Sequence, residues 1–203
     1  MREVFLMEIL AEIITDTLVK EKIINSDDSE IYKYGAELLI STGVNLLLGL
    51  LLGGLFHSMM SGVIYFLVLA TLRTQAGGYH ASTYLWCGMV YCISFLGVMG
   101  MIRLFIYMNI NSACLMLGLL INMMFIWWHA PVLHHRSMEI EVRKHVKRKV
   151  AVIGIIWILI AMGIYYWSPQ AGYAVLASME VVLFYMILGK SRGVAYESYF
   201  TSD

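Results

Sequence analysis

Six long runs of apolar residues dominate the pattern of the chain, and short turn-forming segments separate them. Each run approaches the roughly 20 residues that a helix needs to cross a hydrocarbon core. The separators are His57-Ser58, a glycine pair, Asn109 to Ser112, and Ser168-Pro169. The pattern predicts an all-α, polytopic membrane protein with about six transmembrane helices. We place these helices near residues 36–56, 58–72, 83–102, 110–128, 150–167 and 170–189.

The first 30 residues have a different pattern, in which apolar positions repeat at helical spacing between acidic ones. This arrangement predicts an amphipathic helix that lies in the cytoplasmic interface of the membrane. An acidic polar face does not favour anionic lipid, so packing on the helix bundle and binding to a basic partner stay open as alternatives. The apolar positions are Phe5, Leu6, Ile9, Leu10, Ile13 and Ile14, and the acidic ones include Glu8, Glu12 and Glu21.

Basic residues are distributed unequally between the two sides that six spans define. Thirteen of the 14 Lys and Arg residues fall on the side of the termini, and Arg103 falls on the other. Basic residues concentrate on the cytoplasmic side of membrane proteins, so we expect both termini in the cytoplasm. Six of the thirteen lie within 129–149, which we interpret as a basic cytoplasmic loop: Arg136, Arg143, Lys144, Lys147, Arg148 and Lys149.

Composition supports a membrane-embedded chain of one domain. The 203 residues are 60% hydrophobic and only 14% charged, against roughly 25% charged residues in soluble domains. We therefore treat residues 1–203 as a single membrane domain. The formal net charge is zero, and we expect no nucleic-acid partner. Cys87, Cys92 and Cys114 are an odd number within apolar surroundings, which argues against a disulfide framework and leaves free thiols.

One stretch, RTQAGGYHASTYLWC at residues 73–87, places polar and reactive residues between two apolar runs. On a continuous helix, His80 and Cys87 would lie roughly 10 Å apart along the axis, too far for a nucleophile and its base. Gly77 and Gly78 can adopt turn conformations, and Ser82 or Thr83 can cap a new helix. We therefore expect a loop that folds His80 back over the helix that carries Cys87.

The chemistry that suits this loop is thiol nucleophilic catalysis. His80 would accept the thiol proton of Cys87, and the thiolate would attack a peptide carbonyl. Arg73 is the candidate source of positive potential, because we expect Cys87 to lie beyond the first helical turn, where the helix dipole no longer helps. Gln75 and the amides of the glycine pair are further oxyanion candidates. The structural alternatives are a cysteine that only fills apolar space and a glycine loop that is only a tight turn.

The pattern R-x-x-x-G-G-x-H-A, followed by a cysteine seven residues after the histidine, resembles the accessory gene regulator B family. The resemblance extends over most of the chain, including the element YGAE at Tyr34 to Glu37 and the step Ala130-Pro131. These membrane cysteine endopeptidases of Gram-positive bacteria process the precursor of a cyclic autoinducing peptide. The resemblance implies that Cys87 is the nucleophile and His80 its general base, and it assigns Arg73, Gly77 and Gly78 to the same motif.

The same resemblance implies a substrate, an orientation and an assembly. The substrate would be a short propeptide with an internal Cys or Ser and an acidic C-terminal tail, which is cut on the cytoplasmic side. The internal Cys or Ser would then close a thiolactone or lactone ring. A homodimer in the lipid bilayer is also implied, and no cofactor is expected.

Other polar residues lead to alternative hypotheses. Glu180 near the middle of the last span and Arg103 are intramembrane charges, which are costly and often functional. They support the alternative of a small transporter or peptide exporter, and a binding or assembly protein is a third class. Glu37 is a candidate to orient His80 or Arg73. His129, His134 and His135 lack the spacing of a zinc motif, so we expect no metal site.

Overall fold

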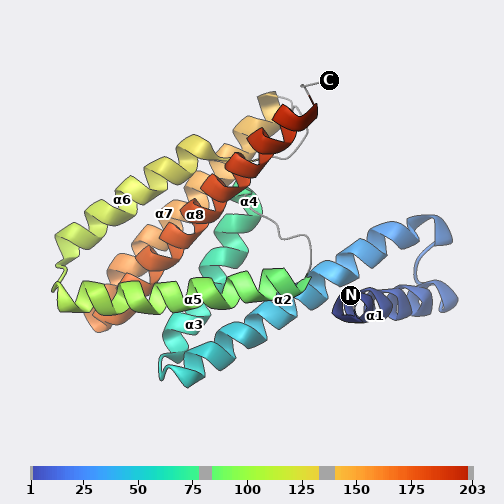
Figure 1. The fold of residues 1–203 in the computed structure, drawn as a ribbon, viewed down its shortest axis with the longest axis horizontal. Helices are drawn as coiled ribbons and strands as arrows, with labels where there is room; N and C mark the ends of the chain where they lie inside the picture. Colours follow the sequence, from blue (N-terminus) through green and yellow to red (C-terminus); the bar gives the residue numbers. More distant parts are fainter. Residues whose placement is uncertain (1, 78–83, 133–139, 201–203) are drawn as a thin grey trace.

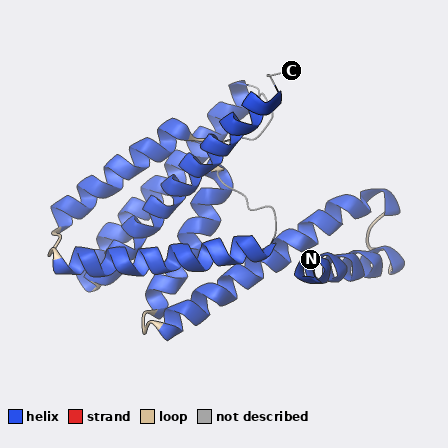
Figure 2. Ribbon diagram, viewed as in Figure 1, coloured by secondary structure: helices blue, strands red, loops and turns tan. Residues whose placement is uncertain are grey.

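A computed structural model describes residues 2–77, 84–132 and 140–200, and these residues are almost entirely helical (Figures 1 and 2). In the described parts of the chain, β-type pairing is limited to one isolated bridge between Gly77 and Val132. The elements in chain order are α1 (Arg2–Lys20), η1 (Ser26–Asp28), α2 (Ser29–Leu55), α3 (Met59–Val68), η2 (Leu69–Arg73), α4 (Thr74–Ala76), α5 (Tyr84–Tyr107), α6 (Ser112–His129), α7 (Ile140–Trp167) and α8 (Pro169–Phe200).

Six helical segments among the described residues are long and apolar enough to cross a membrane, which confirms the predicted all-α polytopic fold. The first begins earlier than predicted, and the fifth begins within the stretch that we interpreted as a basic loop. Residues 140–149 thus form the first turns of α7 and are not a loop. The segments are Ser26–Leu55, Met59–Ala76, Trp86–Tyr107, Ser112–His129, Glu141–Trp167 and Pro169–Lys190.

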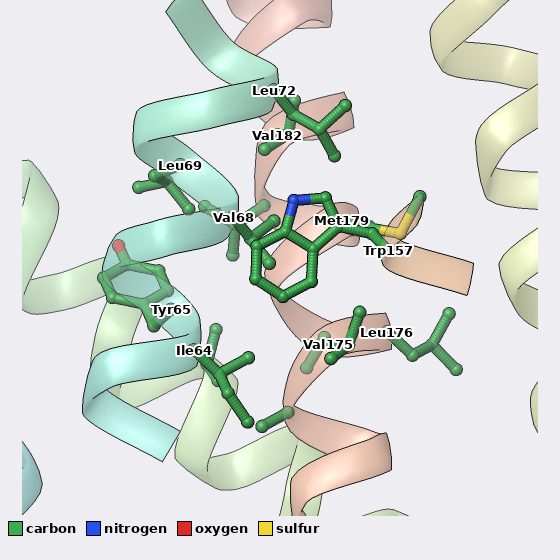
Figure 3. Packing of buried hydrophobic residues seen from close by; sticks show 14 of the residues in the cluster. Ile64, Tyr65, Val68, Leu69, Leu72, Trp157, Val175, Leu176, Met179 and Val182 are labelled. Carbon is green, nitrogen blue, oxygen red and sulfur yellow. The ribbon is translucent and has the colours of Figure 1, made fainter. Parts of the chain in front are cut away.

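The last span, α8, forms the centre of the bundle. It packs against α3, α5, α6 and α7 and is the most buried of the six spans, whereas α2 is the least buried. Figure 3 shows the core where α3 and η2 meet α7 and α8. Its side chains come from α3 and η2 (Ile64, Tyr65, Val68, Leu69, Leu72), α7 (Trp157) and α8 (Val175, Leu176, Met179, Val182).

The N-terminal helix α1 packs mainly beside the first half of α2 and makes a smaller contact with α5 (Figure 1). Ala11 and Thr15 are buried in this contact, and Lys33 Nζ lies 3.2 Å from Glu12 Oε2. The large apolar side chains of α1 face outward instead, since Ile9, Leu10, Ile13 and Ile14 are all exposed. This orientation is the one that an interfacial helix needs, because the apolar stripe stays available to lipid.

The crossing of α2 and α3 depends on glycines. A Cβ atom added at Gly62 of α3 would lie 3.1 Å from the Cα of Gly53 and closer still to the carbonyl oxygen of Gly49. Small residues allow helix backbones to approach this closely in membranes. The two helices are therefore in direct backbone contact.

The segments that connect the spans fall into two groups according to their contacts, one group on each side of the membrane-spanning bundle. At one side, Gln170 Nε2 donates to Ser58 Oγ at 2.9 Å, and the hydroxyls of Tyr165 and Tyr173 donate to the carbonyl of Ile110. At the other side, Gly77 pairs with Val132. The segments after the first, third and fifth spans thus lie together, and those after the second and fourth spans lie together, as six alternating spans require.

Candidate active site

The second span ends in a widened π-helical turn, η2, which places Arg73 at its last position. Such a turn leaves backbone carbonyls without their regular helical donors, and two threonine hydroxyls supply replacements. Thr71 Oγ1 donates to the carbonyl of Leu67 at 2.7 Å, and Thr74 Oγ1 donates to that of Ala70 at 2.7 Å. Trp157 of α7 donates its Nε1–H to Thr71 Oγ1 at 2.9 Å, so the turn is also held from a neighbouring span.

Arg73 meets the last span at Tyr185. The Cζ atom of the guanidinium lies 4.7 Å from the centroid of the Tyr185 ring, within the range of a cation–π interaction. The Tyr185 hydroxyl lies 2.6 Å from Ser94 Oγ of α5. One tyrosine of α8 therefore connects the end of the second span with the third span.

Cys87 lies at the beginning of the third span and is half-buried. Cys87 is the fourth described residue of α5, and the residues before Tyr84 lie outside the described ranges, so its position relative to the first helical turn stays a prediction. Cys87 also lies within electrostatic range of Tyr185, as does Arg73.

Gly77 ends the second helical segment with a conformation that favours glycine, φ +76° and ψ −166°. Its N–H donates to the carbonyl of Arg73 at 2.9 Å, and the N–H of Val132 donates to the carbonyl of Ala76 at 2.9 Å. In this conformation the Gly77 N–H is engaged by the helix and is not directed at a substrate. Val132, which follows the cis Ala130-Pro131 bond, thus lies directly against the turn.

Several predicted site residues are placed differently or lie outside the described parts. Gly78 and His80 fall outside the described residues, and with them the geometry of the predicted Cys–His pair. Gln75 is half-buried in α4, two residues after Arg73 in the chain. Glu37 is half-buried on α2, and α2 approaches α5 at Leu48 and Gly49. At 1.5 Å per residue, Glu37 lies roughly 16 Å along the helix from that contact, and its orienting role stays a prediction.

The charges that support the transport alternative do not come together. Glu180 is half-buried on α8 and Arg103 is exposed on α5, and these two described side chains form no ion pair with each other.

The histidines that suggested a metal are only partly described. His129 contacts the carbonyl of Phe125 through Nδ1 at 2.9 Å, while His134 and His135 lie outside the described residues. Over the described ranges, no three His, Cys, Asp or Glu side chains are grouped as metal ligands.

Tyr185, Ser94 and Trp157 were not singled out from the sequence. Ser94 gave a weak signal, because it carries a hydroxyl seven residues after Cys87 and hence on the same helical face. Tyr185 and Trp157 are aromatic residues in apolar spans, and such residues usually fill a core. Their role depends on partners 86 to 112 residues away in the chain.

A family model described as accessory gene regulator B matches residues 11–188, which include Arg73, Gly77, Cys87 and Tyr185. No curated protein and no solved structure matches the chain.

Proposed function

Because the chain belongs to the accessory gene regulator B family, we propose that it is a membrane cysteine endopeptidase that cuts a short quorum-sensing propeptide. The match covers most of the chain, and the family takes part in the processing of the quorum-sensing peptide. The six apolar spans make the protein a multi-pass membrane protein. The cysteine mechanism, its residues and its orientation are our proposal.

The observation that carries this proposal is that Arg73 and Cys87 both approach the same tyrosine. The two residues come from different spans, and both lie within electrostatic range of Tyr185 on a third. A cation beside a thiol favours the thiolate, which is the nucleophilic form. A guanidinium that shares Tyr185 with the thiol is in keeping with a catalytic cysteine rather than one that only fills apolar space.

In the proposed reaction, His80 takes the proton from the Cys87 thiol, and the thiolate attacks the carbonyl carbon of the scissile peptide bond. Arg73 and the Gln75 side chain are the candidates to stabilise the oxyanion. The tetrahedral intermediate collapses as the C–N bond breaks, and His80 returns its proton to the leaving amine. The C-terminal tail departs, and the N-terminal part stays on Cys87 as a thioester.

Ring closure then releases the enzyme without another cofactor. His80 accepts the proton of the thiol or hydroxyl of an internal Cys or Ser of the peptide, whose sulfur or oxygen attacks the thioester carbonyl and forms a thiolactone or lactone. The C–S bond to Cys87 breaks, and the expelled thiolate takes the proton back from His80. The exchange of one thioester for another is close to neutral in energy. Release of the tail, and not ATP hydrolysis, would drive the thiolactone reaction forward.

The first turns of α7 are a candidate dock for the acidic tail. Arg143, Lys144, Arg148 and Lys149 are exposed there, and α7 packs against α4 at the end of the second span. Clustered cations attract a negatively charged segment before it is cut. By the positive-inside rule, the same cations favour a cytoplasmic location for this end of the bundle, and we propose that the site faces the cytoplasm.

The test is the intact mass of a candidate propeptide from a neighbouring reading frame, co-expressed with variants of the full chain. We expect the unaltered protein to remove a C-terminal tail, and Cys87→Ala and His80→Ala to leave the propeptide whole. Cys92→Ala is the matched control, since Cys92 lies on the same helix and is also half-buried. His129→Ala serves the same purpose for His80.

Two results would contradict the proposal. Continued cleavage by Cys87→Ala would rule out the thioester mechanism. Equal loss of cleavage in Cys92→Ala would show that the helix, and not the Cys87 thiol, is what the reaction needs. If the chain is instead a transporter, Glu180→Gln should abolish transport, whereas Cys87→Ala should leave it unchanged.

A further inference from the structure

Tyr185 is a junction of three spans and is almost fully buried, with 1% of its surface exposed. Its ring faces the Arg73 guanidinium, and its hydroxyl faces α5. Ser94 Oγ can donate to the carbonyl of Val90 at 2.7 Å. The Tyr185 hydroxyl lies 2.6 Å from Ser94 Oγ, and either oxygen can be the donor between them, because the Tyr185 hydroxyl can also donate to the Val90 carbonyl, at 3.3 Å.

The two residues of α5 that contact the Tyr185 hydroxyl lie on the same face of the helix as Cys87. Val90 and Ser94 follow Cys87 by three and seven residues, so all three share one face of the helix. Around this part of α5, the end of the second span contributes Arg73, α8 contributes Tyr185, and α2 contributes Leu48 and Gly49. Tyr185 is thus the connection between the guanidinium and the helical face that carries the thiol.

A guanidinium at the end of a span needs such a connection if it is to remain near the thiol. Arginine side chains are long and flexible, and near helix ends they extend toward the interface, where water solvates the charge. An aromatic ring that is itself fixed offers a competing site through the cation–π interaction. The hydrogen bonds to Ser94 and Val90 hold the ring of Tyr185 on α5, so the guanidinium that it attracts stays beside α5 as well.

We infer that Tyr185 is a positioning residue, which holds the Arg73 guanidinium beside Cys87 and thereby sustains the reactivity of the thiol. This inference rests on the proposed function, because it assigns a purpose to the same thiol. It extends the site to the last span, which contributes no residue to the motif at 73–87.

The test measures the alkylation of Cys87 by iodoacetamide in the full chain, with Cys92→Ala and Cys114→Ala so that one thiol reports. The alkylation rate depends on the fraction of Cys87 present as thiolate and on how accessible the thiol is. Accessibility affects the rate equally at both pH values, so the test compares variants by the ratio of the rate at about pH 7 to the rate at about pH 10. We expect Arg73→Gln and Tyr185→Leu each to lower this ratio about tenfold, the scale of a nearby charge. Combining them should lower it no further, because both remove one interaction. Tyr185→Phe, which keeps the ring, should lower it about threefold or less.

Tyr173→Leu is the matched control. Tyr173 lies on the same helix, is 3% exposed, packs its ring on Phe105, and donates its hydroxyl to the carbonyl of Ile110. It lies 12 residues from Tyr185, about 18 Å along α8 and toward the other side of the membrane. Its loss should destabilise the bundle to a similar extent while leaving the alkylation ratio of Cys87 unchanged.

Three results would overturn the inference. The first is a ratio that Arg73→Gln lowers and Tyr185→Leu does not change. The second is an equal decrease of the ratio in Tyr173→Leu, which would make the effect one of general packing. The third is a double variant in which the effects of Arg73→Gln and Tyr185→Leu on the ratio add in full. Failure of the proposed function is seen separately, as cleavage by Cys87→Ala, since the alkylation ratio requires no propeptide.

Discussion

Gly77 meets two demands that no other residue type meets together. Its φ of +76° and ψ of −166° lie in a region that is essentially restricted to glycine. A Cβ atom would also collide with the carbonyl oxygen of Val132, whose own N–H is bonded to Ala76. The residue therefore ends the second helical segment and at the same time admits the backbone that follows the fourth span.

We predict that Gly77→Ala lowers the free energy of unfolding by about 1–3 kcal/mol, the cost of forcing this conformation on alanine. Cleavage of the propeptide should fall with it, since Arg73 lies four residues away. Thermal unfolding of the protein in detergent measures the first effect. Gly100→Ala is the control, because Gly100 is an exposed helical residue with open space at its Cβ position. Equal losses in both variants would refute this account of Gly77.

At the scale of the elements, the first two spans are joined by backbone contact where other pairs are joined by side chains. Gly49 and Gly53 of α2 meet Gly62 of α3, and all three are buried. By contrast, α3 and η2 meet α8 through large side chains such as Tyr65, Leu69 and Met179 (Figure 3). Phe56 at the end of α2 also packs on Phe95 of α5, so the glycine crossing and this contact together attach α2 to the bundle core.

We predict that Gly62→Ala destabilises the protein by about 1–3 kcal/mol, as overpacking of a close contact does. The neighbours are backbone atoms, which cannot rotate out of the way as a side chain can. Gly43→Ala, on α2 with open space around it, should change the free energy of unfolding by less than about 0.5 kcal/mol. Unfolding in detergent by a denaturant tests both, and a Gly62→Ala protein as stable as the Gly43→Ala protein would disprove the contact.

For the whole molecule, the two groups of inter-span segments lie at opposite ends of the bundle. The side that joins Gly77 and Val132 also carries the contact of Lys147 with the Trp127 ring, at 5.0 Å from Nζ to the centroid. The other side carries the hydrogen bonds among Ser58, Gln170 and Ile110. By the positive-inside rule, the distribution of basic residues predicts that the first side faces the cytoplasm.

This orientation predicts the pattern of labelling by a membrane-impermeant maleimide in intact cells. In a chain whose own cysteines are replaced by alanine, Trp167→Cys should be labelled from outside, since Trp167 is 94% exposed at the far end of α7. Lys144→Cys, exposed at the other end of the same helix, should be labelled only after the membrane is permeabilised. The opposite pattern would invert the orientation and remove the proposed site from the cytoplasm.

The sequence by itself determined the properties that depend on local chemistry. The apolar runs predicted six spans because transfer into lipid depends on the side chains of one segment. The glycine pair predicted a break after Arg73, because the conformations open to glycine do not depend on the rest of the chain. The motif at 73–87 predicted the family for the same reason, since its residues are close together in the chain.

The tertiary structure alone decided which helical faces meet. Tyr185, Ser94 and Arg73 come together because α8 is at the centre of the bundle and is rotated toward the ends of two other spans. Every lipid-embedded helix is apolar around most of its surface, so hydrophobic periodicity does not indicate which side faces a neighbour. That choice is made by close packing and by hydrogen bonds between residues about a hundred positions apart, and it added the last span to a site that the sequence placed between the second and the third.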